Sequence, residues 1–278
     1  EVMTYYDEQK ARELVIEAGH KLLENKLIAR TWGNISARIS DTEFIITPSG
    51  RAYDTLHPEE LVKVNMETLK YKGSIKPSSE KGIHAHAYLL RQDVNFVIHT
   101  HQLYASAIGT EGKDFDFAPC ASYGLPGTGK LKLNVSSAIA QNPDKFSFLM
   151  EKHGAVCLGK SFDDAFALAE ELEDNCKAEF ISRVGDIAED RFVYEYAKAH
   201  SSLKAYIDDY AQLVGANAKI KFGEVITPAS DDEEAVKMIV TKNCAAALYA
   251  RSAKPLSLAD ALLQRIVYLK KYSKQKDK

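Results

Sequence analysis

The sequence has little glycine and proline, no excess of basic residues and no long apolar run. Its 278 residues include 15 glycines and 8 prolines, too few for a collagen-like or low-complexity chain. Lysine and arginine total 36 against 39 aspartates and glutamates, which gives a net charge of −3. This balance provides no basic footprint for nucleic acid or an anionic membrane, so we expect neither as a partner. No run of 18 or more apolar residues occurs, so no transmembrane helix is expected.

Cysteine is also scarce. The four cysteines are widely spaced and form no C-x-x-C pair: Cys120, Cys157, Cys176 and Cys244. The spacing therefore indicates neither a zinc ribbon nor a thioredoxin-like motif, and reduced thiols are the simplest interpretation. The first residues lack the basic-then-apolar layout of a secretory signal. We therefore expect a cytoplasmic protein.

Hydrophobic periodicity divides the chain into two parts. Up to residue 186, short apolar strands alternate with amphipathic helices, a pattern that favours an α/β layer architecture. From residue 187 onward the periodicity is mostly helical. With 45% hydrophobic residues, the chain can bury one large domain or one domain with an appendage. We therefore predict an α/β domain over 1–186 and a mainly helical C-terminal extension over 187–278.

The same periodicity predicts the individual elements. Strands are predicted over 35–40, 43–46, 62–66, 95–99, 146–150 and 155–158. Helices are predicted over 7–26, 81–91, 103–108, 191–216, 231–250 and 257–271, with a further long helix that begins at residue 162. Residues 110–130 are expected to be irregular.

The strongest chemical signal is the motif His99-Thr100-His101, which follows the apolar stretch Phe96–Ile98. Side chains alternate across a strand, so two histidines two positions apart point the same way and can chelate one ion. A zinc ion held by imidazole nitrogens, with one position left open for substrate, is the usual catalytic arrangement. Two histidines rarely suffice, so a third ligand must come from elsewhere in the chain.

The predicted secondary structure around the other histidines indicates which of them could be a metal ligand. His84 and His86 have the same spacing but lie in a predicted helix, about 200° apart around its axis, so they cannot share a metal. His153 follows an apolar strand and precedes Gly154, which allows a sharp turn. On this pattern alone, His153 is either a surface residue at a strand end or the third ligand. The remaining histidines in helical or polar contexts are interpreted as structural: His20, His57 and His200.

Three short loops are rich in glycine, serine and asparagine: Gly33-Asn34, Ser49-Gly50 and Ser78-Ser79. Such loops can hold a phosphate through N–H and O–H groups without a lysine. Glu80 follows the third loop directly, which would place a general base beside a phosphorylated substrate. Each loop taken singly is better explained as an ordinary turn or helix cap.

Taken together and in order, five motifs resemble the class II aldolase/adducin family. They are Gly33-Asn34-x-Ser36, Thr47-Pro48-Ser49-Gly50, Pro77-Ser78-Ser79-Glu80, His99-Thr100-His101 and His153-Gly154. The resemblance covers about residues 7–185 and is closest to the aldolases that cleave ketose 1-phosphates, with the pentulose-phosphate 4-epimerases as near relatives. It implies a three-layer α/β/α sandwich around a mostly antiparallel sheet. It also implies a homotetramer with its sites near subunit interfaces.

The resemblance implies a role for each motif. His99, His101 and His153 match the zinc ligands, and Glu80 matches a carboxylate that serves as acid/base and can also approach the metal. The positions that match the family's phosphate-binding residues are Gly33, Asn34, Ser49, Gly50, Ser78 and Ser79. The implied cofactor is Zn²⁺ or another divalent metal, and the implied partner is a phosphorylated sugar. Residues 187–278 have no counterpart in the family pattern, and Tyr123 is the nearest candidate for the family's catalytic tyrosine.

The predicted reaction is reversible cleavage of a ketose 1-phosphate to dihydroxyacetone phosphate and an aldehyde, through an enediolate that a metal stabilises. The alternatives on the same scaffold are 4-epimerisation of a pentulose 5-phosphate and decarboxylation of a sugar-acid phosphate. Family epimerases carry Asp at the position of Glu80, which favours the aldolase. A non-catalytic adducin-like scaffold would lack the metal histidines, so their presence here argues against it. A zinc hydrolase is disfavoured because the chain has no H-E-x-x-H motif.

Overall fold

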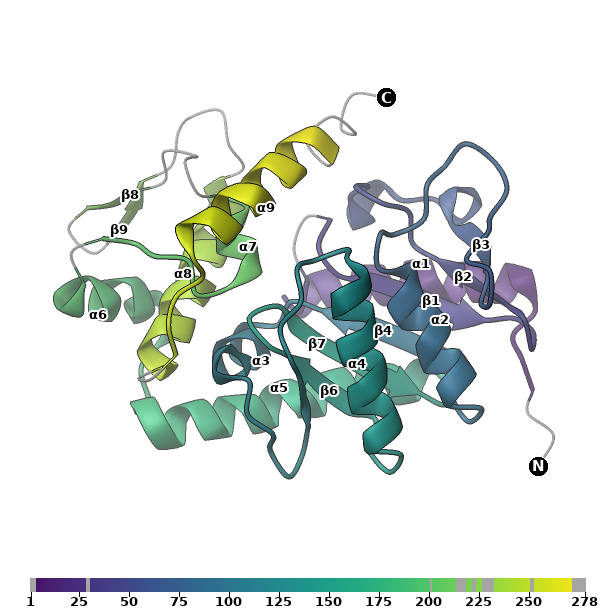
Figure 1. The fold of residues 1–278 in the computed structure, drawn as a ribbon, viewed down its shortest axis with the longest axis horizontal. Coiled ribbons are helices and arrows are strands. Elements are labelled where there is room, and N and C mark those ends of the chain that lie inside the picture. The colour runs from purple at the N-terminus through teal and green to yellow at the C-terminus, as the bar shows by residue number, and fades with distance from the viewer. Residues whose placement is uncertain are drawn as a thin grey trace.

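A seven-stranded mixed sheet forms the centre of the computed structural model, which describes residues 4–28, 31–200, 202–213, 219–221, 224–226, 233–250 and 253–271. The strands run in the order β3-β2-β1-β4-β7-β6-β5 (Figure 1). Neighbouring strands are antiparallel except β5 and β6, which are parallel. The strands are β1 (Asn34–Arg38), β2 (Glu43–Ile46), β3 (Val62–Asn65), β4 (Phe96–Thr100), β5 (Cys120–Ala121), β6 (Ser147–Met150) and β7 (Gly154–Gly159).

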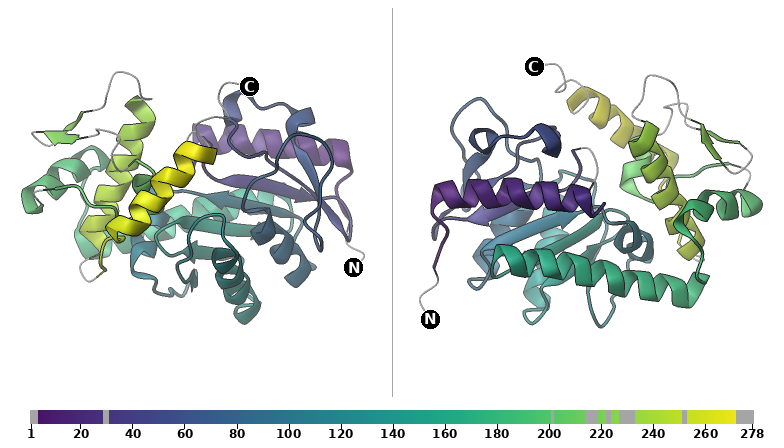
Figure 2. Two further views of the ribbon diagram at one scale, coloured as in Figure 1. Left: turned by 45° about the horizontal axis from the view of Figure 1, so that its top comes forward. Right: turned by 180° about the vertical axis from the view of Figure 1, so that it is seen from behind.

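Two helices cover each face of the sheet. Helices α1 (Glu8–Glu24) and α5 (Phe162–Val184) lie on one face, and α2 (Lys81–Leu90) and α4 (Gly129–Gln141) lie on the other, as Figures 1 and 2 show. Each face packs into its own cluster of buried apolar side chains, because successive strand residues point to opposite sides. The predicted three-layer α/β/α sandwich around a mostly antiparallel sheet is therefore confirmed.

The register of the central strands sets the position of the functional motifs. In β4, Phe96 and Ile98 face the α1–α5 layer and Val97 faces the α2–α4 layer. By the same alternation, His99 lies on the α2–α4 side. Residue Asn34 at the start of β1 pairs with His99. The first loop motif and the histidine motif therefore meet at one end of the sheet.

The C-terminal segment is mainly helical, as predicted. It contains α6 (Phe192–Ala199), α7 (Asp208–Ala211), α8 (Glu233–Tyr249), α9 (Leu258–Lys271) and a small hairpin of β8 (Lys219–Lys221) and β9 (Glu224–Ile226). Helix α8 packs against α3 (Leu103–Ile108), and both contribute to the same apolar cluster as α1 and α5. Helix α5 ends at Val184, just before the predicted boundary, and the division into domains 1–186 and 187–278 stays a prediction.

One predicted helix is wrong, and one helix was not predicted. The helix predicted over 191–216 is interrupted, since residues 202–207 are not helical, while residues 201 and 214–216 lie outside the described residues. Here Asn243 of α8 accepts hydrogen bonds from the backbone N–H groups of Tyr206 and Ile207, which replaces the helical pairing. Helix α4 was not predicted, although apolar residues recur in it every four positions and are buried: Leu131, Val135 and Ile139. Its N-terminus is capped by Thr128, whose side chain accepts from the backbone N–H of Leu131.

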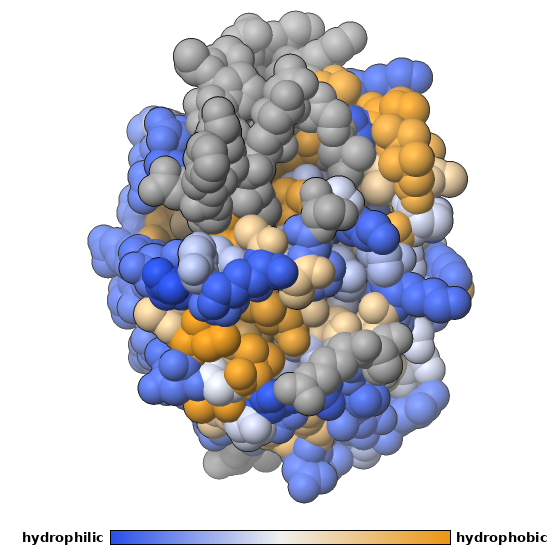
Figure 3. All heavy atoms as spheres, turned by 90° about the vertical axis from the view of Figure 1, so that its left-hand side faces the viewer, coloured by the Kyte–Doolittle hydropathy of each residue, from blue (hydrophilic) through white to orange (hydrophobic). Residues whose placement is uncertain are grey.

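The surface over the C-terminal segment is mixed. Figure 3 shows apolar patches on this side of the molecule, separated by hydrophilic side chains. In the part of the chain that the structure describes, no helix combines the length and the apolar character needed to cross a bilayer. All four cysteines are free thiols, which agrees with the expected reduced state.

Candidate active site

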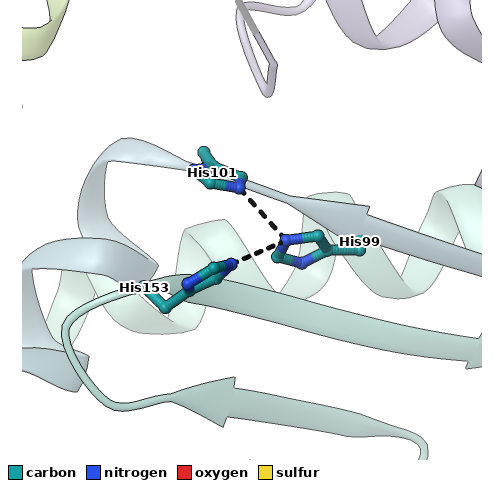
Figure 4. A group of neighbouring side chains, drawn as sticks. All are labelled: His99, His101 and His153. Carbon is teal, nitrogen blue, oxygen red and sulfur yellow. Dashed lines mark hydrogen bonds between the residues drawn. The ribbon is translucent and has the colours of Figure 1, made fainter. Parts of the chain in front are cut away.

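Three histidines meet at one end of the sheet. His99 lies in β4 and His101 follows two residues later, while His153 comes from the turn between β6 and β7. The Nε2 atom of His99 lies 3.1 Å from the Nε2 atoms of both His101 and His153. Figure 4 shows the three rings converging on one point. All three side chains are buried, and together they form a group that could hold a metal ion.

A glycine makes this convergence sterically feasible. A Cβ atom on Gly154 would lie 2.2 Å from the carbonyl oxygen of Thr100, so a larger residue would push β7 away from the end of β4. The preceding turn contains Lys152 with a φ of 58°, in the left-handed region. The His153-Gly154 motif thus brings its histidine against the other two by backbone packing.

Each histidine ring is oriented through its Nδ1 atom. The Nδ1 of His99 donates to the carbonyl oxygen of Ala155 at 2.8 Å. The Nδ1 of His101 donates to Oδ1 of Asp209 at 2.6 Å, and that of His153 donates to Oδ2 of Asp208 at 2.9 Å. Since every Nδ1 faces an acceptor, the Nε2 lone pairs point to the common centre, the arrangement typical of metal-binding histidines.

Glu80 completes the group from the start of α2. Its Oε2 atom lies 3.2 Å from Nε2 of His99, and its Oε1 atom lies 3.2 Å from Nε2 of His153. Oε2 also accepts a hydrogen bond from Nδ2 of Asn34 at 2.9 Å. Oε1 is buried, and among the described residues it makes no contact of hydrogen-bond geometry, the one with His153 included. A buried carboxylate within 3.2 Å of two imidazole nitrogens fits a fourth metal ligand.

The charges around the histidines also fit a divalent cation. Three buried carboxylates surround the group, on Glu80, Asp208 and Asp209, and one buried ammonium lies beside them on Lys242. Lys242 forms an ion pair with Asp209 and donates to the backbone oxygen of His101 at 2.8 Å. With neutral imidazoles the group carries two net negative charges, from three carboxylates and one ammonium. A divalent cation would neutralise them, which matters because uncompensated buried charge is costly.

The pKa values of the ligand residues reflect this crowding. Burial raises the pKa of the Glu80 carboxyl group, but the imidazoles of His153 and His99 outweigh burial and hold that pKa well below its usual range. Burial lowers the pKa of His101 to about 4, which keeps this ring neutral at pH 7. Burial also lowers the pKa of His153, but the carboxylates of Glu80 and Asp208 prevail and raise it to about 10. These pKa shifts apply to the site without a metal ion. In that state the protonated ring of His153 carries the positive charge that faces Glu80 and Asp208.

The three serine- and glycine-rich loops line one cavity beside the histidines. All six residues matched to phosphate binding face this cavity together with Glu80, His101 and His153. Two backbone hydrogen bonds join the second and third loops, from the N–H of Ser78 to the oxygen of Thr47 and from the N–H of Ser49 to the oxygen of Lys76. Within the described lining there is no lysine or arginine.

One of the six loop residues has a second set of contacts. The side chain of Asn34 donates to Glu80 through Nδ2, and its Oδ1 hydrogen-bonds Nε2 of His84. His84 in turn bonds Oγ of Ser36 through Nδ1 at 2.6 Å. Burial lowers the pKa of His84 to about 3, so this ring is neutral. His86, on another side of α2, bonds Oγ of Ser136 instead, so these two histidines do not share a site.

The remaining wall of the cavity comes from the C-terminal segment. Three residues of α9 line it, namely Gln264, Val267 and Tyr268, and Gln212 lies next to α7. Across the opening, Trp32 donates through Nε1 to Oε1 of Gln212 at 3.0 Å. The segment beyond the residues predicted to form the α/β domain therefore provides one wall of the cavity.

Sequence reasoning missed every contribution of this segment, including Asp208, Asp209 and Lys242. The available signal was two adjacent aspartates between the apolar stretches Ala205–Ile207 and Tyr210–Ala211. Acidic residues that interrupt an apolar stretch indicate buried and paired carboxylates. Tyr123, the candidate for a catalytic tyrosine, donates to Oδ1 of Asp208 at 3.1 Å. Its hydroxyl group therefore lies behind the histidines, among their supporting residues.

The fold and the site together define a class of proteins. The profile of the class II aldolase and adducin N-terminal domain matches residues 13–180, and the chain belongs to this family. A 5-deoxy-D-ribulose 1-phosphate aldolase of Bacillus thuringiensis serovar kurstaki is 33% identical over 177 residues, which span 59% of this chain and 82% of the relative. An L-fuculose phosphate aldolase of Methanocaldococcus jannaschii is 30% identical over 171 residues, which span 58% and 91%. The predicted family and the predicted class of enzyme, a lyase of the aldolase type, are confirmed.

Solved structures share the fold. An L-fuculose 1-phosphate aldolase superposes with a TM-score of 0.56 at 23% identity, covering 83% of this chain and 94% of that chain. YgbL from Klebsiella pneumoniae superposes with a TM-score of 0.57 at 24% identity, covering 66% and 93%. At these identities the likeness establishes the architecture only.

Proposed function

We propose that this protein is a metal-dependent aldolase that reversibly cleaves a ketose 1-phosphate into dihydroxyacetone phosphate and an aldehyde. One observation carries the proposal: His101, His153 and Glu80 line the same cavity as the serine- and glycine-rich loops, and His99 joins the two histidines in the group that could hold a metal. A carbonyl group and a phosphate of one small substrate can therefore be held at once. The names of the two curated relatives, both of them sugar-phosphate aldolases, support the same reaction class.

The donor set favours zinc among the divalent metals. Three imidazole nitrogens with one carboxylate and an open side are typical of catalytic zinc sites. The proposed ligands are His99, His101, His153 and Glu80. A metal ion bound there supplies a Lewis acid for the negative charge of the enediolate, a contribution of several kcal/mol in such enzymes.

The chain's own residues then have distinct tasks. The six loop residues matched to phosphate binding would hold the phosphate through N–H and O–H groups. Glu80, as a carboxylate, would take up the hydroxyl proton released when the carbon–carbon bond breaks and return it to the carbon of the enediolate. Asn34, fixed by His84, donates to Glu80 and would keep its carboxylate aimed at that carbon. The walls formed by α9 would exclude water from the reactive enediolate.

Epimerisation of a pentulose phosphate and decarboxylation of a sugar-acid phosphate remain the alternatives on this scaffold. Both would use the same metal and the same phosphate loops. Products distinguish them, since cleavage yields a triose phosphate, epimerisation conserves carbon number and decarboxylation releases carbon dioxide. A cytoplasmic location and a homotetramer belong to the same proposal, and the mass of the protein in solution tests the tetramer.

The direct experiment incubates the zinc-loaded protein with a panel of ketose 1-phosphates and measures released dihydroxyacetone phosphate. A parallel sample is treated with a chelator. Release that the chelator abolishes supports the proposal. A metal-loaded protein that releases no triose phosphate from any of these substrates would contradict it.

A further inference from the structure

We propose that the C-terminal helical segment is a working part of the metal centre, with Asp209 and Asp208 as positioning residues that hold His101 and His153 in their metal-binding tautomers. The inference rests on the proposed metal site and adds residues that the resemblance does not provide. The profile match ends at residue 180, and both aspartates lie beyond it. The supporting observations are the contacts on each side of the two carboxylates.

Asp209 is held between His101 and Lys242. Its Oδ1 atom accepts from Nδ1 of His101 at 2.6 Å, while its Oδ2 atom pairs with Nζ of Lys242. Asp209 is 1% exposed and Lys242 is 3% exposed, so bulk water screens neither charge. The lysine also donates to the backbone oxygen of His101. Lys242 therefore holds the carboxylate of Asp209 in place. It also holds the backbone of His101, the proposed ligand that Asp209 orients.

Asp208 is held in the same manner from the opposite side. Its Oδ2 atom accepts from Nδ1 of His153 at 2.9 Å. Its Oδ1 atom accepts from Nε2 of Gln264 at 2.6 Å and from the hydroxyl group of Tyr123 at 3.1 Å. The carboxylate is fully buried. Helix α9, which supplies Gln264, therefore reaches the metal centre through one intermediate residue.

The segment has its own scaffold that places both aspartates. Asn243, adjacent to Lys242 on α8, accepts from the N–H groups of Tyr206 and Ile207 and donates to the oxygen of Lys204. The N–H group of Asp208 donates to the oxygen of Lys152, next to the ligand His153. Two adjacent residues of α8 thus hold the chain that presents the carboxylates.

The aspartates select the tautomer because a carboxylate can only accept. A carboxylate that accepts a hydrogen bond from Nδ1 requires the proton of the neutral ring to be on Nδ1. The lone pair of Nε2 is then available to the metal. In Asp209→Asn the amide oxygen would face Lys242, which has only donors, so the amide nitrogen would face His101. The His101 ring would then accept at Nδ1 and carry its proton on Nε2. That proton occupies the position that the metal needs.

The test compares Asp209→Asn with the wild type and with Asp190→Asn, a matched change at an exposed aspartate of the same segment. Zn²⁺ affinity is measured by competition with a chromophoric chelator. The tautomer of His101 is read from the imidazole ¹⁵N shifts of the metal-free protein, which distinguish a proton on Nδ1 from one on Nε2. Asp208→Asn provides a second variant if Asp209→Asn fails to fold.

We expect Asp209→Asn to bind Zn²⁺ about 10- to 100-fold more weakly, with the proton of His101 moved to Nε2. Asp190→Asn should match the wild type in both measurements. Wild-type affinity and an unchanged tautomer in folded Asp209→Asn would overturn the inference. The proposed function fails separately, if the wild type binds no divalent metal, and the tautomer measurement then still decides the role of Asp209.

Discussion

The family-matched region and the C-terminal segment contribute to the same site in different ways. The first supplies the groups proposed to touch the metal and the phosphate, His99, His101, His153 and the three loops, all within short motifs. The second supplies groups that contact those residues, above all Asp208 and Asp209. The proposed ligands stand in short motifs, and alternation along β4 is enough to bring His99 and His101 to one side. Supporting residues need only reach a ligand, so they can come from any element packed nearby.

The largest expected effect comes from removing a ligand in the first region. His101→Ala should lose the metal and the activity together, because two imidazoles and one carboxylate leave the site incomplete. Metal content after dialysis, activity and far-UV circular dichroism of the same preparation check this. Stoichiometric metal in folded His101→Ala would show that His101 is not a ligand.

The second-largest effect is expected from a change at Glu80, which separates turnover from metal binding within the family-matched region. Glu80→Gln should retain the metal on three histidines and lose turnover by about 10²-fold, since an amide cannot deliver the proton. Steady-state kinetics and metal analysis give both values. Glu67→Gln, at an exposed position, serves as the matched control. Near-wild-type turnover in Glu80→Gln would rule out its role as acid/base.

A partly buried carboxylate, that of Glu173 on α5, gives a pH effect on stability. Burial raises the pKa of Glu173 to about 7, although its carboxylate accepts from the N–H groups of Tyr104 and Ala105. Between pH 5 and 7 the folded carboxyl group keeps a proton that the unfolded chain has released. The free energy of unfolding should therefore fall by about 2 kcal/mol over this range because of Glu173.

Urea unfolding at pH 5 and pH 7 measures this contribution as the difference between the wild type and Glu173→Gln. The variant has no titrating group at residue 173, so its stability should fall less as pH rises. Equal pH dependence in the two proteins would show that Glu173 is ionised throughout the range.

The smallest predicted effect concerns the wall that the C-terminal segment provides. Val267→Phe places a larger side chain in the cavity and should raise KM about tenfold, with metal affinity unchanged. Ile266→Phe, next to it but 48% exposed, should leave KM unchanged. Equal KM values for the wild type and Val267→Phe would mean that α9 does not bound the substrate.

The sequence sufficed for the groups that occur in local patterns. The α/β class and the β4 strand with His99 follow from alternation and spacing, whereas the three-layer sandwich and the role of the loops follow from the resemblance to the family. The supporting contacts could not be predicted, because His101 and Asp209 are 108 positions apart and meet only in the folded chain. The helix predicted over 191–216 failed for a related reason. Asn243, far along the chain, satisfies the backbone of Tyr206 and Ile207, and no local pattern records it.

The most direct test of this account is cleavage by the zinc-loaded protein with and without chelator. With a ketose 1-phosphate as substrate, the account predicts dihydroxyacetone phosphate as a product and complete loss of its formation after chelation. The contradicting result is cleavage at an unchanged rate after chelator treatment, in protein that metal analysis shows to be metal-free. It would rule out the central claim that His99, His101, His153 and Glu80 act through a bound metal.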